Sequence, residues 1–209
     1  MTKSKYHATK WNSGLAEWKD TIAQLPGRAF LSVVFTWDLP EAYTRAAWLN
    51  NMGYEVYAGG PAVALNPDYL APLAHVNGHQ IDALPHHNPN ATFTSRGCIR
   101  RCKFCAVPRI EGELTELLDW KPRPIVCDNN LLATSRAHFD KVIDSLKPVP
   151  AIDFNQGLDP RLLTKYHAER LAELKLHKVR LAWDHLEDEQ TVYAAIQALR
   201  KAGIGKKAI

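Results

Sequence analysis

The sequence of 209 residues contains no long hydrophobic run. Its longest apolar stretches, such as AFLSVVF at residues 29–35, have the length of a strand and fall well short of the about 20 residues that a membrane-spanning helix needs. The charged beginning, MTKSKYHATKW, is not followed by an apolar stretch, so it does not resemble a secretory signal. We therefore expect no membrane partner and a cytoplasmic, reducing location.

The sequence also lacks internal repeats and low-complexity tracts. Hydrophobic residues make up 46% of the chain and charged residues 23%, which is typical of a soluble globular protein. The length suits one domain, or one domain with a small lobe. The formal net charge of +4 is mildly basic, which permits a nucleic-acid partner but does not by itself predict one.

The alternation of strand and helix patterns is less regular in residues 1–90 than in residues 91–209. In residues 1–90 we expect a small N-terminal α/β lobe with two strands and one helix, followed by a linker rich in Pro, Asn and His. Residues 91–209 alternate more evenly between apolar strands and amphipathic helices, which is typical of parallel βαβ units. The strands expected there are 91–95, 123–127, 151–159 and 178–184, and the helices are 111–120, 135–146, 164–176 and 188–203.

Polar residues follow several of these apolar strands directly. They are Asp128, Asn129, Asn130, Asn155, Gln156 and Asp184. Because the carboxyl ends of parallel strands lie at one edge of a sheet, where ligands bind, these side chains are candidates for a site. The alternative is that each one forms a turn or caps a helix.

Cysteine is scarce, and its distribution is uneven. Three of the four cysteines, Cys98, Cys102 and Cys105, fall within eight positions, at the spacing of one helix face. Gly97 and Pro108 bracket the run, which leaves little length for a helix packed on a core. A reducing compartment favours a metal site or a catalytic site over disulfides.

Zinc is one candidate metal, since Cys102 and Cys105 form a C-x2-C pair. A four-ligand site would need Cys127, or one of the upstream histidines His86 and His87. Cys127, however, lies inside the apolar run PIVCD, and we expect it to be a small core residue.

An iron–sulfur cluster is the other candidate. Three thiolates on one tight loop can bind three irons of a cubane and leave the fourth iron open, which a catalytic metal requires. Four cationic side chains lie among or just after the thiols, namely Arg100, Arg101, Lys103 and Arg109. Their charge would favour thiolates and an anionic cluster, although they also fit an ordinary solvated loop.

The stretch GCIRRCKFC resembles the cluster motif of the radical S-adenosylmethionine (radical SAM) superfamily. It has the C-x3-C-x2-C spacing, the preceding glycine and the aromatic Phe104 before the last cysteine, and it follows the first strand of a βα series. The resemblance implies a partial (β/α) barrel of about four βα units in residues 91–209, C-terminally incomplete against the usual six. Either the sequence is a fragment, or the missing wall comes from elsewhere.

The resemblance also implies the chemistry. Cys98, Cys102 and Cys105 would ligate a 4Fe–4S cluster whose fourth iron chelates the amino and carboxylate groups of S-adenosylmethionine. An electron from a donor such as flavodoxin or ferredoxin would cleave this molecule to methionine and a 5′-deoxyadenosyl radical, which abstracts hydrogen from a substrate that the sequence does not identify.

Several residues take cofactor-binding roles by this resemblance. The family usually has a Gly-Gly-Glu-like stretch after the second strand, where this chain reads CDNN, so Asp128, Asn129 and Asn130 would contact the amino group. The other expected cofactor-binding residues are Phe104, Gln156, Asp159, Arg161 and Asp184. The guanidinium of Arg161 would suit a carboxylate. The alternative for Asp159 with Pro160 is that they start the next helix.

Two further comparisons bear on function. The N-terminal lobe faintly resembles cobalamin-binding domains but lacks their D-x-H-x-x-G motif, so we expect no cobalamin. CAVPRIEG loosely resembles methylthiotransferases that modify tRNA or a ribosomal protein, yet the lobe has none of the cysteines that such enzymes carry there. The alternative from another class is a non-catalytic module that binds zinc or a structural iron–sulfur cluster.

Overall fold

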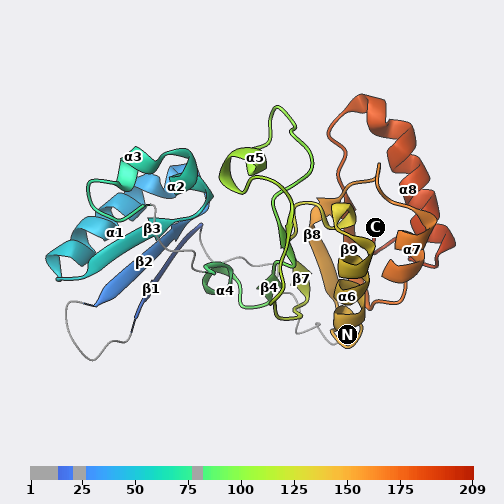
Figure 1. Cartoon of the computed structure of the whole chain (residues 1–209), viewed down its shortest axis with the longest axis horizontal. Coiled ribbons are helices and arrows are strands. Elements are labelled where there is room, and N and C mark those ends of the chain that lie inside the picture. Colours follow the sequence, from blue (N-terminus) through green and yellow to red (C-terminus); the bar gives the residue numbers. More distant parts are fainter. Residues whose placement is uncertain (1–13, 21–26, 77–81) are drawn as a thin grey trace. The chain divides into compact units, whose positions relative to one another are not determined.

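The computed structural model describes residues 14–20, 27–76 and 82–209 of the chain (Figure 1). The chain divides into two compact units, Met1–Pro89 and Asn90–Ile209. Among the helices in the described ranges, none has the length and apolar character to cross a membrane.

The first unit contains a three-stranded sheet in the order β1-β2-β3. Strand β1 (Leu15–Lys19) pairs antiparallel with β2 (Arg28–Val33), and β2 pairs parallel with β3 (Glu55–Gly59). Helix α1 (Leu39–Asn51) connects the two parallel strands. The short helices α2 (Pro61–Leu65), α3 (Pro67–Leu70) and α4 (Leu84–His87), with the 3-10 turn η1 (Thr36–Asp38), complete the unit.

The core of this unit lies between the sheet and α1. Leu31 and Val33 of β2 are buried against Ala46 and Leu49 of the helix. Strand β1 was not expected from the sequence. It is held to α1 by Glu17, which accepts hydrogen bonds of 2.8 and 2.9 Å from the Arg45 guanidinium, a tertiary contact that a pattern of apolar residues does not reveal.

The second unit is mixed α/β, with a four-stranded parallel sheet in the order β4-β7-β8-β9. Its strands are β4 (Ala91–Thr92), β7 (Ile125–Val126), β8 (Ile152–Leu158) and β9 (Leu176–Leu181). Its longer helices are α6 (Arg136–Leu146), α7 (Lys165–Leu171) and α8 (Glu189–Lys201), and its 3-10 turns are η2 (Leu131–Ala133) and η3 (Leu186–Asp188). The expected alternation of parallel strands and helices is therefore confirmed for residues 123–203.

One apolar core joins these helices to the sheet. It contains Val126, Phe154 and Val179 from the strands, Phe139, Val142, Ile143 and Leu146 from α6, Leu171 from α7 and Leu199 from α8. Helix α6 begins where the Ser135 hydroxyl accepts a hydrogen bond of 3.2 Å from the His138 amide, as an N-cap residue does. Its apolar positions recur at helical period, which buries one face of α6 on the sheet.

The helix expected over residues 111–120 is wrong. There, β6 (Thr115–Glu116) pairs antiparallel with β5 (Ser95–Arg96) as a separate two-stranded ribbon. Glu116 accepts a hydrogen bond from the Ser135 amide, and Leu118 is 91% exposed, so the segment is held by pairing with its neighbours and not by a buried helical face. Tertiary pairing outweighs the helical preference of this short segment.

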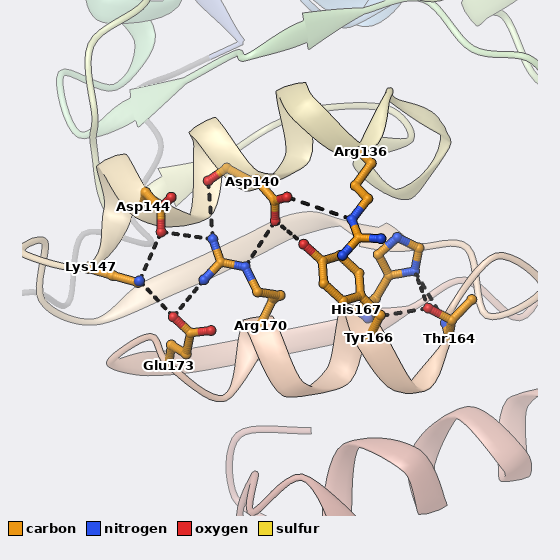
Figure 2. A network of polar contacts seen from close by, with 9 residues as sticks. All are labelled: Arg136, Asp140, Asp144, Lys147, Thr164, Tyr166, His167, Arg170 and Glu173. Atoms are coloured by element: carbon orange, nitrogen blue, oxygen red, sulfur yellow. Dashed lines mark hydrogen bonds and ion pairs between the residues drawn. The ribbon is translucent and has the colours of Figure 1, made fainter.

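Figure 2 shows a network of charged side chains between α6 and α7. Arg170 donates to Asp140 (3.0 Å), Asp144 (2.8 Å) and Glu173 (2.6 Å). Lys147 pairs with Asp144 at 2.8 Å and Glu173 at 2.7 Å. One guanidinium thus satisfies three carboxylates, which fixes the packing of α7 against α6.

Ionisation of these carboxylates favours the folded chain. The hydrogen bond from Tyr166 and the Arg170 guanidinium lower the pKa of Asp140, and hydrogen bonds from Arg170 lower that of Asp144. A carboxyl whose pKa is lower in the folded chain than in the unfolded chain contributes stability above its ordinary pKa of about 4. That contribution is lost as the pH falls through the lowered values.

We therefore expect Arg170→Met to flatten the acid dependence of unfolding. Urea midpoints measured from about pH 7 down to about pH 3 should fall less steeply in the variant than in the unchanged chain. Lys165→Met is the matched control, since Lys165 is 87% exposed on the same helix and pairs with Glu169 at 3.6 Å. If the urea midpoint falls equally steeply with pH in all three chains, the network does not contribute to the acid dependence of unfolding.

Candidate functional site

Three of the four cysteines, Cys98, Cys102 and Cys105, lie on the loop that follows β4 and β5. The one-turn helix α5 (Val107–Ile110) comes near the end of this loop (Figure 1). The base of this loop is narrow. Gly97 has φ +74°, and the Cys98 amide donates to the Gly112 carbonyl at 3.3 Å. A Cβ at Gly97 would lie 2.2 Å from the Glu113 carbonyl oxygen, so glycine is required both for its backbone conformation and for the close approach.

All three loop thiols are free and half-buried. The Cys98 sulfur accepts from the Arg100 amide at 3.3 Å and from Asn130 Nδ2 at 3.7 Å. The Cys105 amide donates to the Cys102 carbonyl at 3.0 Å, which places these two cysteines on one tight turn. Within the described ranges no three His, Cys, Asp or Glu side chains are grouped as a metal site, and the three thiols are not gathered in that way.

A buried polar network connects this loop to the ends of β7 and β8. Asp159, which follows β8, accepts hydrogen bonds from Arg100 Nε (3.1 Å), Asn130 Nδ2 (3.4 Å) and Arg161 Nε (2.7 Å). Burial opposes the ionisation of Asp159, but the hydrogen bonds and charge of Arg161, with the charge of Arg100, lower its pKa. The parallel topology thus brings Asn130, Asp159 and Arg161 together beside Cys98.

Arg161 extends the network toward a second cysteine. Its guanidinium lies 3.5 Å from the Asp188 carboxylate. The hydrogen bond to Asp159 and the negative charge of Asp188 raise the pKa of Arg161, and Cys102 contributes in the same direction. Arg161 is therefore a cation held by two carboxylates, Asp159 and Asp188.

Asn130 has one side-chain atom without a partner. The residue is 3% exposed, and its Nδ2 group donates to Cys98 and Asp159. Its Oδ1 atom is buried and accepts no hydrogen bond in the part of the chain that the structure describes. A buried acceptor of this kind costs free energy unless a donor reaches it, so Oδ1 of Asn130 is a candidate acceptor for an N–H group of a ligand.

Asp128 and Asn129 are turned to other partners. Asp128 is buried and accepts from the Thr94 amide (2.7 Å), the Thr94 hydroxyl and the Ser95 hydroxyl (2.7 Å), which ties the end of β7 to β5. Burial raises the pKa of Asp128, and these hydrogen bonds oppose the rise. Asn129 Nδ2 donates to Glu111 at 2.6 Å. Asp128 thus joins the end of β7 to the segment before the loop, and the Asn129 amide group joins it to Glu111 at the end of the loop.

Three other expected site residues lie apart from this network. Phe104 is exposed, with its ring 6.1 Å from that of His185, so the cysteine loop and the segment after β9 are neighbours. Gln156 is exposed within the irregular part of β8, and Asp184 is exposed after β9. In the described ranges neither Gln156 nor Asp184 has a hydrogen bond to the loop.

The additional zinc ligands considered from the sequence are occupied elsewhere. His86 stacks on Trp18 with ring centroids 4.0 Å apart, and His87 Nε2 lies 2.9 Å from the Ser32 hydroxyl, all within the first unit. Cys127 is 1% exposed, and burial raises the pKa of its thiol to about 12. A thiol of this kind stays protonated and is a poor metal ligand.

This difference predicts a labelling pattern. In the metal-free chain at about pH 8, an alkylating reagent should modify Cys98, Cys102 and Cys105, whereas Cys127 should react only after unfolding, since the thiolate is the nucleophile. Peptide mass spectrometry of the alkylated chain measures each site separately. If Cys127 is labelled as fast as the loop thiols, its thiol is accessible in the folded chain and this prediction is wrong.

Sequence reasoning missed Glu111 and gave Arg100 no individual role. Glu111 accepts from the Gly97 amide and the Asn129 amide group, and Arg100 reaches Asp159. The sequence offers one indication of a turn here, the glycine that follows Glu111. Gly112 does occupy a turn, with φ +77°. The partners of Glu111 are distant in sequence, so the pattern alone could not identify them.

The chain matches no model of a known protein family and no curated protein sequence. The interpretation of the site therefore depends on its residues and on the resemblance of the GCIRRCKFC motif.

Proposed function

We propose that this chain is a radical SAM enzyme in which Cys98, Cys102 and Cys105 bind a 4Fe–4S cluster. The observation that carries the proposal is the placement of three free thiols, at C-x3-C-x2-C spacing, on the loop after the first strand of a four-stranded parallel sheet. The fourth thiol, Cys127, is buried, which leaves three ligands and one open coordination position. We interpret the parallel sheet as part of the (β/α) barrel of that superfamily.

The donor set suits such a cluster. Thiolates are its usual ligands, and the positive charges of Arg100, which is part of the cysteine loop, and of Arg161, which shares Asp159 with it, oppose the accumulation of negative charge. When bound, the cluster would supply the electron that cleaves S-adenosylmethionine. The electron would come from a donor of the flavodoxin or ferredoxin class.

Among the strand-end residues, Asn130 is the best candidate to hold S-adenosylmethionine. Among the residues that the structure describes, none donates to its buried Oδ1 atom, and the ammonium group of the methionine moiety could do so. The oxygens of Asp128 already accept from Thr94 and Ser95, so they have less capacity for this contact. Asp159 and Arg161 would keep Asn130 and the loop in position.

The test is anaerobic reconstitution of the chain with iron and sulfide, followed by dithionite and S-adenosylmethionine, with 5′-deoxyadenosine as the measured product. We expect a brown protein that forms 5′-deoxyadenosine. A variant with all three loop cysteines replaced by alanine is the control for cluster-independent cleavage. A fully loaded chain that forms no product would contradict the enzymatic proposal, and a colourless chain that retains zinc would support a structural metal site instead.

A further inference from the structure

We propose that Glu111 is a positioning residue that closes the base of the cysteine loop and so fixes its thiols for metal binding. The carboxylate is 11% exposed and has three donors around it. Oε2 accepts from the Gly97 amide at 2.8 Å and from Asn129 Nδ2 at 2.6 Å, and Oε1 accepts from Arg96 Nη2 at 2.8 Å. One side chain therefore joins the start of the loop, its end and the segment that follows β7.

The surrounding backbone makes this position critical. Before the loop, Arg96 pairs with Thr115 in the β5-β6 ribbon, and the Cys98 amide bonds to Gly112. Strands β5 and β6 contain two residues each, so the ribbon by itself is a weak closure. Hydrogen bonds to a carboxylate are stronger than those between neutral groups, so Glu111 adds charge-assisted interactions to the backbone contacts at this base.

A closed base reduces the conformational freedom of the segment between Gly97 and Glu111, which contains all three loop cysteines. Ordering a loop costs entropy at the moment of binding unless the fold has already ordered it. Side chains that hold the ligands of a metal site without touching the metal typically change its affinity by about 10- to 100-fold when they are removed. Glu111 has the geometry for that role.

The contacts of Glu111 are to backbone and side-chain donors, so a direct ligand role is not needed to explain them. A merely structural role would lower the stability of the whole unit without singling out the loop. A positioning role instead predicts a local effect at the Gly97 amide, on the thiols and on metal retention. These readouts separate the two roles.

The experiment uses the full chain with Glu111→Ala and Glu111→Gln, first in the metal-free state. We expect hydrogen exchange at the Gly97 amide to become about 10- to 100-fold faster in Glu111→Ala, because its acceptor is lost. Alkylation of Cys98 and Cys105 should also become faster. Glu111→Gln keeps the size and one acceptor oxygen but places an N–H group against the donors, so we expect an intermediate effect.

Glu113→Gln is the matched control in the same segment. Its side chain is 71% exposed and pairs with Arg101, so exchange at Gly97 should match that of the unchanged chain. Exchange at Phe154, in the core strand β8, reports global opening. Unchanged Gly97 exchange in both Glu111 variants, or equal acceleration at Gly97 and Phe154, would overturn the proposal.

The last readout is iron retained after reconstitution and dilution, and this part alone rests on the proposed function. We expect Glu111→Ala to retain iron about 10- to 100-fold more weakly than the unchanged chain. If the unchanged chain retains no iron, the proposed function fails, while the exchange and alkylation results still decide whether Glu111 closes the loop. Full retention by Glu111→Ala, with iron bound by the unchanged chain, would contradict the positioning role.

Discussion

Replacing Cys98, Cys102 or Cys105 by alanine is expected to abolish cluster binding in each case. Each thiolate would hold one iron, and a cubane with two protein ligands has two irons open to solvent and chelators. All three residues are half-buried on a surface loop, so truncation removes little packing and the fold should persist. Iron and sulfide content after anaerobic reconstitution, with the visible absorption of the protein, measures the result.

Cys127→Ala is the matched control within the same chain. Its thiol lies in the core directly after β7, and burial raises its pKa to about 12, so we expect the variant to load the cluster as fully as the unchanged chain. Loss of iron from Cys127→Ala would support a site with four cysteine ligands. Retention of iron by any single loop variant would contradict the three-ligand assignment.

The parallel sheet of the second unit was predictable because local pattern and tertiary structure agree there. Helix α6 has apolar residues at helical period, and its N-cap residue, Ser135, is the first residue of the helix expected over 135–146. The segment 111–120 lacks that agreement, since Leu118 is exposed and Glu116 accepts a hydrogen bond from Ser135. Local propensity is decisive only where packing supports it.

The candidate site was predictable to the extent that chain topology determines it. Because parallel strands end at one edge, Asn130 and Asp159 could be expected near the cysteine loop, and they lie there. The sequence could not show that Asp128 would accept a hydrogen bond from the Thr94 amide. It also could not show that Glu111 would reach Gly97, since both contacts depend on how the loop folds back.

Gly97→Ala is the second variant for which we expect a large effect. Gly97 has φ +74°, and left-handed backbone costs an alanine about 1–2 kcal/mol. Its new Cβ would also lie 2.2 Å from the Glu113 carbonyl oxygen, which belongs to the backbone and cannot rotate away. The base of the loop must then open, which breaks the contact between the Cys98 amide and Gly112 and withdraws the Gly97 amide from Glu111. We expect severe loss of iron retention, together with faster alkylation of the loop thiols.

Gly112→Ala separates the backbone strain from the steric overlap. Gly112 has φ +77°, almost the same conformation, but nothing lies within 4 Å of the position of its Cβ. The backbone penalty should therefore be similar in both variants, and the steric overlap should affect Gly97→Ala alone. Urea unfolding and iron retention of the two variants, measured side by side, isolate the contribution of the overlap. If Gly97→Ala is as stable to urea and retains as much iron as Gly112→Ala, the narrow base does not determine the placement of Cys98. The closure by Glu111 then loses its structural basis as well.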